Sequence, residues 1–247
     1  MRITAVAAGK GGIGKTTTAA ELLAELARRG VRAGAIDLDQ QGNLSTLLGI
    51  EDTAELPGTT AEVLAGECST QTAAVAVEGL PGVELLAGDD YLRSLAGSLS
   101  PVRIRDLAQE WASRWDHVVI DCPPALDNLT LAAIVAADDL VSPVAPSRFA
   151  LDGLARLAEV IAEQVAPQLN PAARVSWVVP MMVDGRRRID RESVELLAED
   201  YPGRVTGPVR RSVAAEYAAV VGRPVSLYDP RAAVAQDYRA AAVQILG

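Results

Sequence analysis

The chain has 247 residues, of which 49% are apolar, and a formal net charge of −9. This apolar content can build a buried core, which excludes a disordered chain, and no apolar run reaches the roughly 20 residues that cross a bilayer. Its two cysteines, Cys68 and Cys122, are too few for a disulfide framework or a four-thiolate metal site. The acidic balance excludes a protein that coats nucleic acid over its whole surface, and we expect a cytoplasmic protein without a secretory leader.

The first elements are a strand, a glycine-rich loop and a helix. Residues 3–8 form a short apolar run that glycines interrupt in the loop 9–14. From Lys15 onward apolar residues recur at helical spacing, and two arginines with Gly30 favour a helix end. Residues 33–38 have the length and composition of a second buried strand. This order predicts a βαβ unit.

Short apolar strands and helical segments alternate along the rest of the chain. Thr59 and Glu62 have the spacing of a capping box for a short helix through Leu64. The alternation predicts one α/β domain spanning residues 1–247, a P-loop NTPase fold with a mostly parallel twisted sheet and helices on both faces. Further strands are predicted over 83–86, 118–120, 140–144 and 175–179, and helices over 104–115, 128–137, 151–165 and 193–199.

The loop 9–16 reads Gly-Lys-Gly-Gly-Ile-Gly-Lys-Thr and matches the phosphate-binding pattern G-x-x-x-x-G-K-[ST]. It lies between a predicted strand and a predicted helix, where this pattern functions. Glycines let backbone N–H groups turn toward phosphate oxygens, and the helix N-terminus adds partial positive charge. We therefore predict a nucleotide site in which Lys15 reaches the β- and γ-phosphates and Thr16 binds Mg²⁺.

Lysine use is the second unusual feature of this loop. The chain contains 21 arginines but only two lysines, Lys10 and Lys15. Both lysines lie in this loop, whereas every other basic residue is arginine. This distribution indicates that the loop needs a compact ammonium group on a flexible side chain, which the planar guanidinium of arginine cannot replace. Chance placement combined with codon bias is the alternative.

Carboxylates follow two of the predicted strands at their carboxyl ends, where ligands of open α/β sheets bind. Asp121 follows residues 118–120 and is the candidate that holds Mg²⁺ through water. Asp39 follows residues 33–38 and is the candidate that positions the attacking water and supports the magnesium shell; a strand-end or helix-capping role is the alternative.

Two reactive residue types lie near Asp121. Cys122 has no nearby histidine or basic pair in the sequence, so we expect a small packing residue. His117 is the only histidine of the chain. We expect it at a sheet edge, in a surface or structural role rather than in catalysis.

Residues 10–17 resemble the deviant Walker A motif of the ParA/MinD family of ATPases. In that family the first lysine crosses a dimer interface and contacts the nucleotide of the other subunit, which is the role that the resemblance implies for Lys10. Residues 37–43 are similar to the family's D-x-D-P-Q-G-N switch segment, with Gln40 in place of proline, a change that loosens the turn. The resemblance implies that ATP is bound by Lys10, Gly11, Gly12, Ile13, Gly14, Lys15, Thr16 and Thr17.

The match to the ParA branch of the family extends over nearly the whole chain, including residues 121–124, 129–154 and 222–238. It implies an ATPase with slow intrinsic turnover that forms a homodimer with ATP and binds DNA without sequence preference on the nucleoid. A ParB-like or other cargo adaptor then stimulates hydrolysis. We expect no N-terminal helix-turn-helix extension and no sequence-specific operator binding.

Arginines are frequent between residues 184 and 223, where eight arginines accompany seven acidic residues, while the remainder of the chain carries −10. The resemblance implies DNA contact at Arg186, whereas another arginine of the family is replaced by Val213 or a neighbour. A solvated charged face is the alternative. Phosphate contacts are predicted for Arg186, Arg187, Arg188, Arg210 and Arg211.

Other functions stay open within the family. A ParA-like ATPase that positions a protein cargo would have nearly the same sequence. A MinD-like membrane-site regulator should end in a basic amphipathic helix, but residues 239–247 contain one cation and a thin apolar face, so we expect no membrane contact. The spacing of Cys68 and Cys122 does not fit a nitrogenase-like reductase. A metabolic enzyme that shares the P-loop would transfer phosphate to a small acceptor instead of water.

Overall fold

The computed structural model describes residues 1–247, apart from the side chain of Arg148. One seven-stranded sheet has the order β3-β4-β2-β5-β1-β6-β7, in which β3 pairs antiparallel with β4 and the other neighbours are parallel. The predicted α/β fold with a mostly parallel sheet is therefore confirmed. The strands are β1 (Arg2–Val6), β2 (Ala33–Asp37), β3 (Val75–Ala76), β4 (Val83–Leu86), β5 (His117–Asp121), β6 (Asp139–Val144) and β7 (Val175–Pro180).

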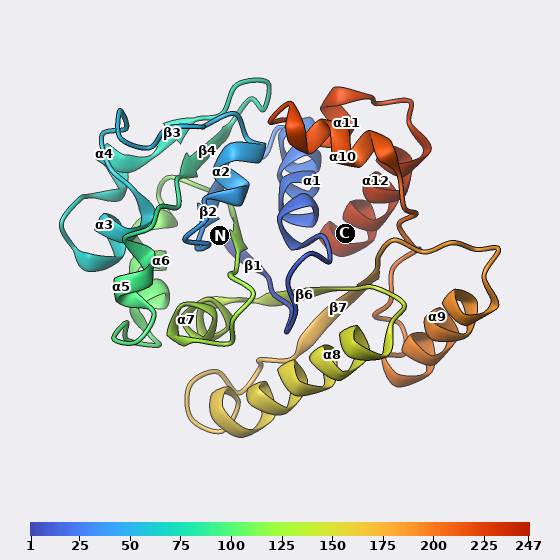
Figure 1. Cartoon of the computed structure of the whole chain (residues 1–247). Helices are drawn as coiled ribbons and strands as arrows, with labels where there is room; N and C mark the ends of the chain where they lie inside the picture. The colour runs from blue at the N-terminus through green and yellow to red at the C-terminus, as the bar shows by residue number, and fades with distance from the viewer.

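Helices cover both faces of the sheet, as Figure 1 shows. One core lies on the face covered by α3 (Thr60–Ala65), α6 (Arg103–Trp111), α7 (Asn128–Ala136) and α8 (Arg148–Val160), and α8 continues as a π-helical turn at Ile161–Val165. The other core lies on the face covered by α1 (Lys15–Arg28), α2 (Asn43–Leu47), α10 (Val213–Val220), α11 (Val225–Tyr228) and α12 (Ala233–Leu246). The remaining helices are α4 (Thr70–Ala73), α5 (Leu92–Leu95) and α9 (Arg188–Asp200).

The structure can be compared with the sequence predictions for individual helices. Thr59 caps α3 through a complete capping box with Glu62. Trp111 and Trp115 are buried in the first core, whereas Trp177 is only partly buried. Helix α9 begins at Arg188, five residues before the predicted start, and the buried Asp190 in its first turn accepts from the backbone N–H of Asp184 at 2.8 Å.

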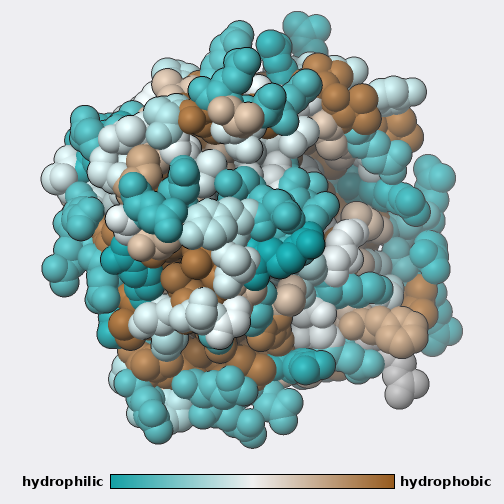
Figure 2. All heavy atoms as spheres, turned by 60° about the vertical axis from the view of Figure 1, so that its left-hand side comes forward, coloured by the Kyte–Doolittle hydropathy of each residue, from teal (hydrophilic) through white to brown (hydrophobic). Residues whose placement is uncertain are grey.

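The molecular surface is mixed in character. On the face that Figure 2 shows, hydrophilic side chains stand outermost and apolar residues lie between them. Among the described residues, no helix is both long enough and apolar enough to cross a membrane.

His117 lies inside the sheet rather than at its edge, because β5 pairs with both β2 and β1. Its Nε2 is 2.9 Å from Oγ1 of Thr4, and only 7% of the residue is exposed. Burial, aided by the charge of Arg2, lowers the pKa of His117 to about 4. The imidazole is therefore neutral in the folded protein at pH 7 and has a structural role.

We expect His117 to make the fold sensitive to acid. The unfolded chain takes up the imidazole proton near pH 6.5 but the folded chain only near pH 4, so the stability present above pH 6.5 is lost as the pH falls toward 4. The free energy of unfolding contributed by His117 should fall by about 2 kcal/mol between pH 7.5 and 5. Urea unfolding of wild type and His117→Gln at both pH values measures this difference, since the carboxylates common to both proteins cancel. A difference that does not change with pH would contradict the assignment.

Candidate nucleotide-binding site

The loop between β1 and α1 forms one wall of a cavity of about 610 Å³. Gly12 and Gly14 have left-handed backbone angles, with φ of +71° and +90°. A Cβ on Gly14 would come within 2.5 Å of the Met181 methyl group, and a Cβ on Gly9 within 2.7 Å of the Gly153 carbonyl oxygen. Glycine is therefore required at positions 12 and 14 by the left-handed backbone angles, and at position 9 by the close approach of the α8 backbone.

The predicted phosphate-binding residues meet at this cavity. Gly11, Gly12, Gly14, Lys15, Thr16 and Thr17 all line it, whereas Ile13 is buried and does not. Lys15 is only 7% exposed, and its Nζ donates to the carbonyl oxygen of Lys10 at 3.4 Å. An ammonium held at the start of a helix, beside backbone N–H groups that turn inward, is suited to bind an anionic triphosphate.

Asp121 ends β5 directly beneath the loop. Both of its carboxylate oxygens are buried, and neither has a hydrogen-bond partner in the described part of the chain. Burial and the nearby carboxylate of Asp37 raise the pKa of Asp121 well above its ordinary value, while Thr16 and Lys15 lower it. A buried carboxylate without a partner is costly. The carboxylate of Asp121 and the hydroxyl of Thr16 are oxygen groups of the kind that Mg²⁺ prefers, and Thr16 lines the cavity.

Asp37 is a structural carboxylate, a role that its position in the sequence did not reveal. Its Oδ2 accepts from the backbone N–H and the hydroxyl of Ser45, both at 2.8 Å, and its Oδ1 accepts from the N–H of Asp39 at 3.0 Å. Complete burial raises its pKa to about 6. Asp37 therefore holds the end of β2 against α2 and sets the position of Asp39.

Asp39 lines the cavity opposite the phosphate-binding loop. Its Oδ1 accepts from the N–H of Gln41 at 3.0 Å and its Oδ2 from Nδ2 of Asn43 at 3.1 Å. Each carboxylate oxygen keeps a lone pair for a further donor. The geometry therefore suits a residue that accepts a hydrogen bond from a water molecule in the cavity.

Gln40 cannot restrict its backbone angle φ as a proline would, but its side chain forms a hydrogen bond with α5. Its Oε1 accepts from Nε of Arg93 at 3.0 Å, and Arg93 also pairs with Asp90 at 2.9 Å. This hydrogen bond connects the turn after β2 to α5. Both side chains are accessible to water, so the contribution to stability is small.

Lys10 does not line the cavity of its own chain. Its Nζ lies 5.7 Å from the ring centroid of Phe149 on α8, in a cation–π contact, and Phe149 is largely exposed. The ammonium is therefore held at the open surface beside the phosphate-binding loop, where a neighbouring molecule can reach it.

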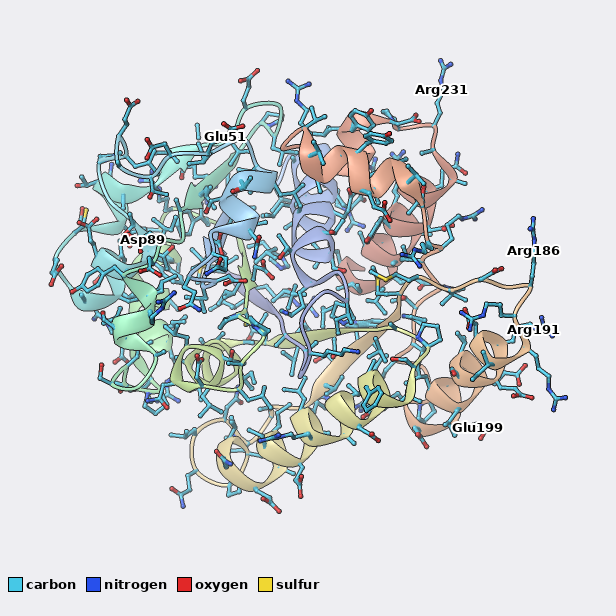
Figure 3. The ribbon with its side chains drawn as sticks, viewed as in Figure 1. Glu51, Asp89, Arg186, Arg191, Glu199 and Arg231 are labelled. Atoms are coloured by element: carbon cyan, nitrogen blue, oxygen red, sulfur yellow. The ribbon has the colours of Figure 1, made fainter. Side chains whose placement is uncertain are left out.

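The five arginines predicted to contact DNA lie in two segments that meet at one edge of the sheet, where Val183 and Arg210 form a β-bridge. Arg210 binds Asp237 with two hydrogen bonds, Arg188 pairs with Glu192, and Arg187 lies 3.6 Å from Asp190. The guanidinium groups of Arg186 and Arg211 form no ion pair among the described residues, although the backbone N–H of Arg186 donates to Oδ1 of Asp184 at 3.0 Å. Arg186 projects into solvent from the loop that leads into α9 (Figure 3).

Sequence reasoning missed the distal wall of the cavity. Met181, Met182, Arg210, Arg211 and Tyr238 line it from segments more than 160 residues beyond the loop. Met181 and Tyr238 are buried apolar-type residues that nothing local distinguishes from ordinary core residues. Charge alone predicts DNA contact for Arg210 and Arg211, but the structure places both on the wall of the cavity.

Comparisons with known proteins agree with this geometry. A family model described as AAA domain matches residues 1–175. The chromosome partitioning protein ParA of Caulobacter vibrioides is 37% identical over 100% of this chain and 94% of its own length, and the sporulation initiation inhibitor protein Soj of Bacillus subtilis is 32% identical over 96% and 95%. The chain belongs to the ParA/MinD family of P-loop ATPases, as the resemblance indicated.

Solved structures share the fold. Cobyrinic acid a,c-diamide synthase from Mycobacterium smegmatis, crystallised with ADP and magnesium, has a TM-score of 0.82 and 28% identity, covering 100% of this chain and 94% of that one. The cell division ATPase MinD of Pyrococcus furiosus has a TM-score of 0.82 at 24% identity, covering 99% and 98%. The similarity to the MinD structure, at 24% identity, supports the fold alone.

Proposed function

We propose that this chain is a ParA-type partition ATPase, a dimerisation switch driven by Mg-ATP. The ATP-bound homodimer binds DNA of the nucleoid without sequence preference, and a ParB-like or other adaptor on the cargo resets it by stimulating hydrolysis. The cargo is plasmid or chromosome DNA. The observation that carries this proposal is the position of Lys10, whose ammonium lies outside its own cavity and is free to reach the nucleotide of a second chain.

Each site residue has a defined task in this proposal. Backbone N–H groups of the loop and the ammonium of Lys15 bind the phosphates, and Thr16 with Asp121 holds Mg²⁺. When bound, Mg²⁺ neutralises negative charge on the β- and γ-phosphates. Asp39 orients the water that attacks, and its own orientation is set by Gln41 and Asn43. The Lys10 ammonium completes the charge stabilisation from the partner chain, so hydrolysis depends on dimer formation.

DNA binding should depend on Arg186, which neither lines the cavity nor pairs with a carboxylate. Arg186→Glu should lower ATP-dependent DNA retention and reduce the slope of log affinity against log salt by about 1 per protomer, because one phosphate contact is lost. Filter retention at several salt concentrations measures both quantities. The matched control is Arg156→Glu on the exposed side of α8, which changes the net charge equally. Equal weakening by both variants would show a general charge effect and contradict a local contact.

A further inference from the structure

The segment after β2 that carries Asp39 forms a tight turn. The N–H of Gly42 donates to the carbonyl oxygen of Asp39 at 2.9 Å, so residues 39–42 form a β-turn in which Gln40 occupies the second position. Proline is favoured at this position of a turn, because its ring fixes φ at about −65° before folding. Glutamine leaves φ free, so the backbone of this turn lacks that constraint.

The side chain of Gln40 provides a constraint of a different kind. Its Oε1 accepts a hydrogen bond from Nε of Arg93 at 3.0 Å, although the two residues are 53 positions apart in the chain. Arg93 belongs to α5, which the fully buried side chain of Leu92 anchors in the first core. The turn after β2 is therefore tied to a helix whose own position is set by core packing.

The connection between β4 and α5 also touches this turn directly. A Cβ on Gly88 would lie 2.7 Å from the carbonyl oxygen of Asp39 and 2.8 Å from Cγ of Asp37, so glycine is needed at position 88 by close approach. The N–H of Gly88 donates to Oγ of Ser45 at 3.0 Å. These contacts fix the distance between the turn and the start of α5, which the hydrogen bond from Arg93 spans.

Arg93 divides its donors between two acceptors. Nε binds Gln40, whereas Nη2 binds Oδ1 of Asp90 at 2.9 Å. Because the two contacts use different nitrogens, the hydrogen bond to Gln40 does not depend on Asp90. The side chains of Arg93 and Asp90 are 64% and 75% exposed, so their ion pair contributes little to stability.

We propose that Gln40 and Arg93 are positioning residues for ATP hydrolysis. Their hydrogen bond takes the place of a proline ring and holds residues 39–42 in the conformation in which Asp39 meets the attacking water. Gln40 lines the nucleotide cavity, whereas Arg93 lies outside it and therefore acts through Gln40. The role of this pair rests on the proposed function, in which Asp39 orients that water.

Removal of the Arg93 side chain should slow hydrolysis without weakening nucleotide binding. A single hydrogen bond between water-accessible groups changes an equilibrium by about two- to fivefold, so Arg93→Ala should lower the rate of phosphate release at saturating ATP by this factor. KM for ATP and affinity for ADP should stay as in wild type, because the phosphate-binding loop and Lys15 are unchanged. Thermal unfolding without nucleotide should also match wild type.

Two substitutions of Gln40 test whether Arg93 acts through it. Gln40→Ala removes the acceptor, so it should slow phosphate release as Arg93→Ala does, and the double variant should be no slower than either. In Gln40→Pro the ring fixes φ without the hydrogen bond, and the N–H that is lost donates to no described residue. Adding Arg93→Ala to Gln40→Pro should therefore leave its rate unchanged.

Asp90→Ala is the matched control for Arg93→Ala. It removes the ion pair at the same place but leaves Nε of Arg93 free to donate to Gln40. Phosphate release from Asp90→Ala should therefore equal that of wild type.

Three results would overturn the proposal: an unchanged rate for Arg93→Ala, an equal loss from Arg93→Ala in wild type and in Gln40→Pro, or weaker ADP binding by Arg93→Ala, which indicates support of the whole cavity. Asp39→Ala distinguishes these failures from failure of the proposed function. If Asp39→Ala slows release and Arg93→Ala does not, only the positioning role is lost. Undiminished release from Asp39→Ala removes the proposed role of Asp39 itself.

Discussion

Replacement of Lys15 by alanine is expected to remove most of the affinity for both ADP and ATP. The ammonium is 7% exposed at the start of α1, where charge-assisted hydrogen bonds to phosphate are strong. Loss of one partner from such a pair costs about 2–5 kcal/mol, which corresponds to roughly 30-fold to 4,000-fold weaker binding. Titration calorimetry with each nucleotide measures the change. Thermal unfolding without nucleotide should show that the variant remains folded.

Lys10→Ala is the informative comparison for Lys15→Ala. The Lys10 ammonium lies over Phe149 and does not line the cavity, so ADP affinity should remain close to that of wild type. ATP-dependent dimerisation should be lost, because the contact from one chain to the nucleotide of the other is removed. Sedimentation with ATP measures the dimer, and normal dimerisation of Lys10→Ala would refute the role in the partner's site.

Asp39→Ala is expected to separate ATP binding from hydrolysis. General acid–base and water-orienting residues contribute about 10²-fold to 10⁴-fold to rate, so phosphate release should fall by this factor. Binding and dimerisation should persist because Lys15, Thr16 and Lys10 are unchanged, and the ATP-bound dimer should therefore accumulate.

The matched control for Asp39→Ala is Asp90→Ala, which removes a carboxylate that is exposed and pairs with Arg93 outside the cavity. Phosphate release from Asp90→Ala should equal that of wild type. Undiminished release from Asp39→Ala would show that another group orients the water.

The amino-acid sequence by itself determined the phosphate-binding loop, the buried parallel strands and the capping box of α3. These features depend on neighbouring residues: successive glycines, an apolar run of strand length, or Thr59 three positions before Glu62. The carboxyl ends of parallel strands meet at one edge, so the proximity of Asp39 and Asp121 also followed from the strand pattern.

Tertiary structure alone decided the distal wall of the cavity, the roles of Asp37 and His117, and the exposure of α10. The alanine-rich segment 213–246 is apolar on several sides, so its periodicity does not indicate which face meets the sheet. Whether a valine of α10 is buried depends on which residues pack against it. The formation of the short antiparallel strand β3 depends on its pairing with β4. Burial and hydrogen-bond partners come from residues distant in the chain, and local pattern carries no information about them.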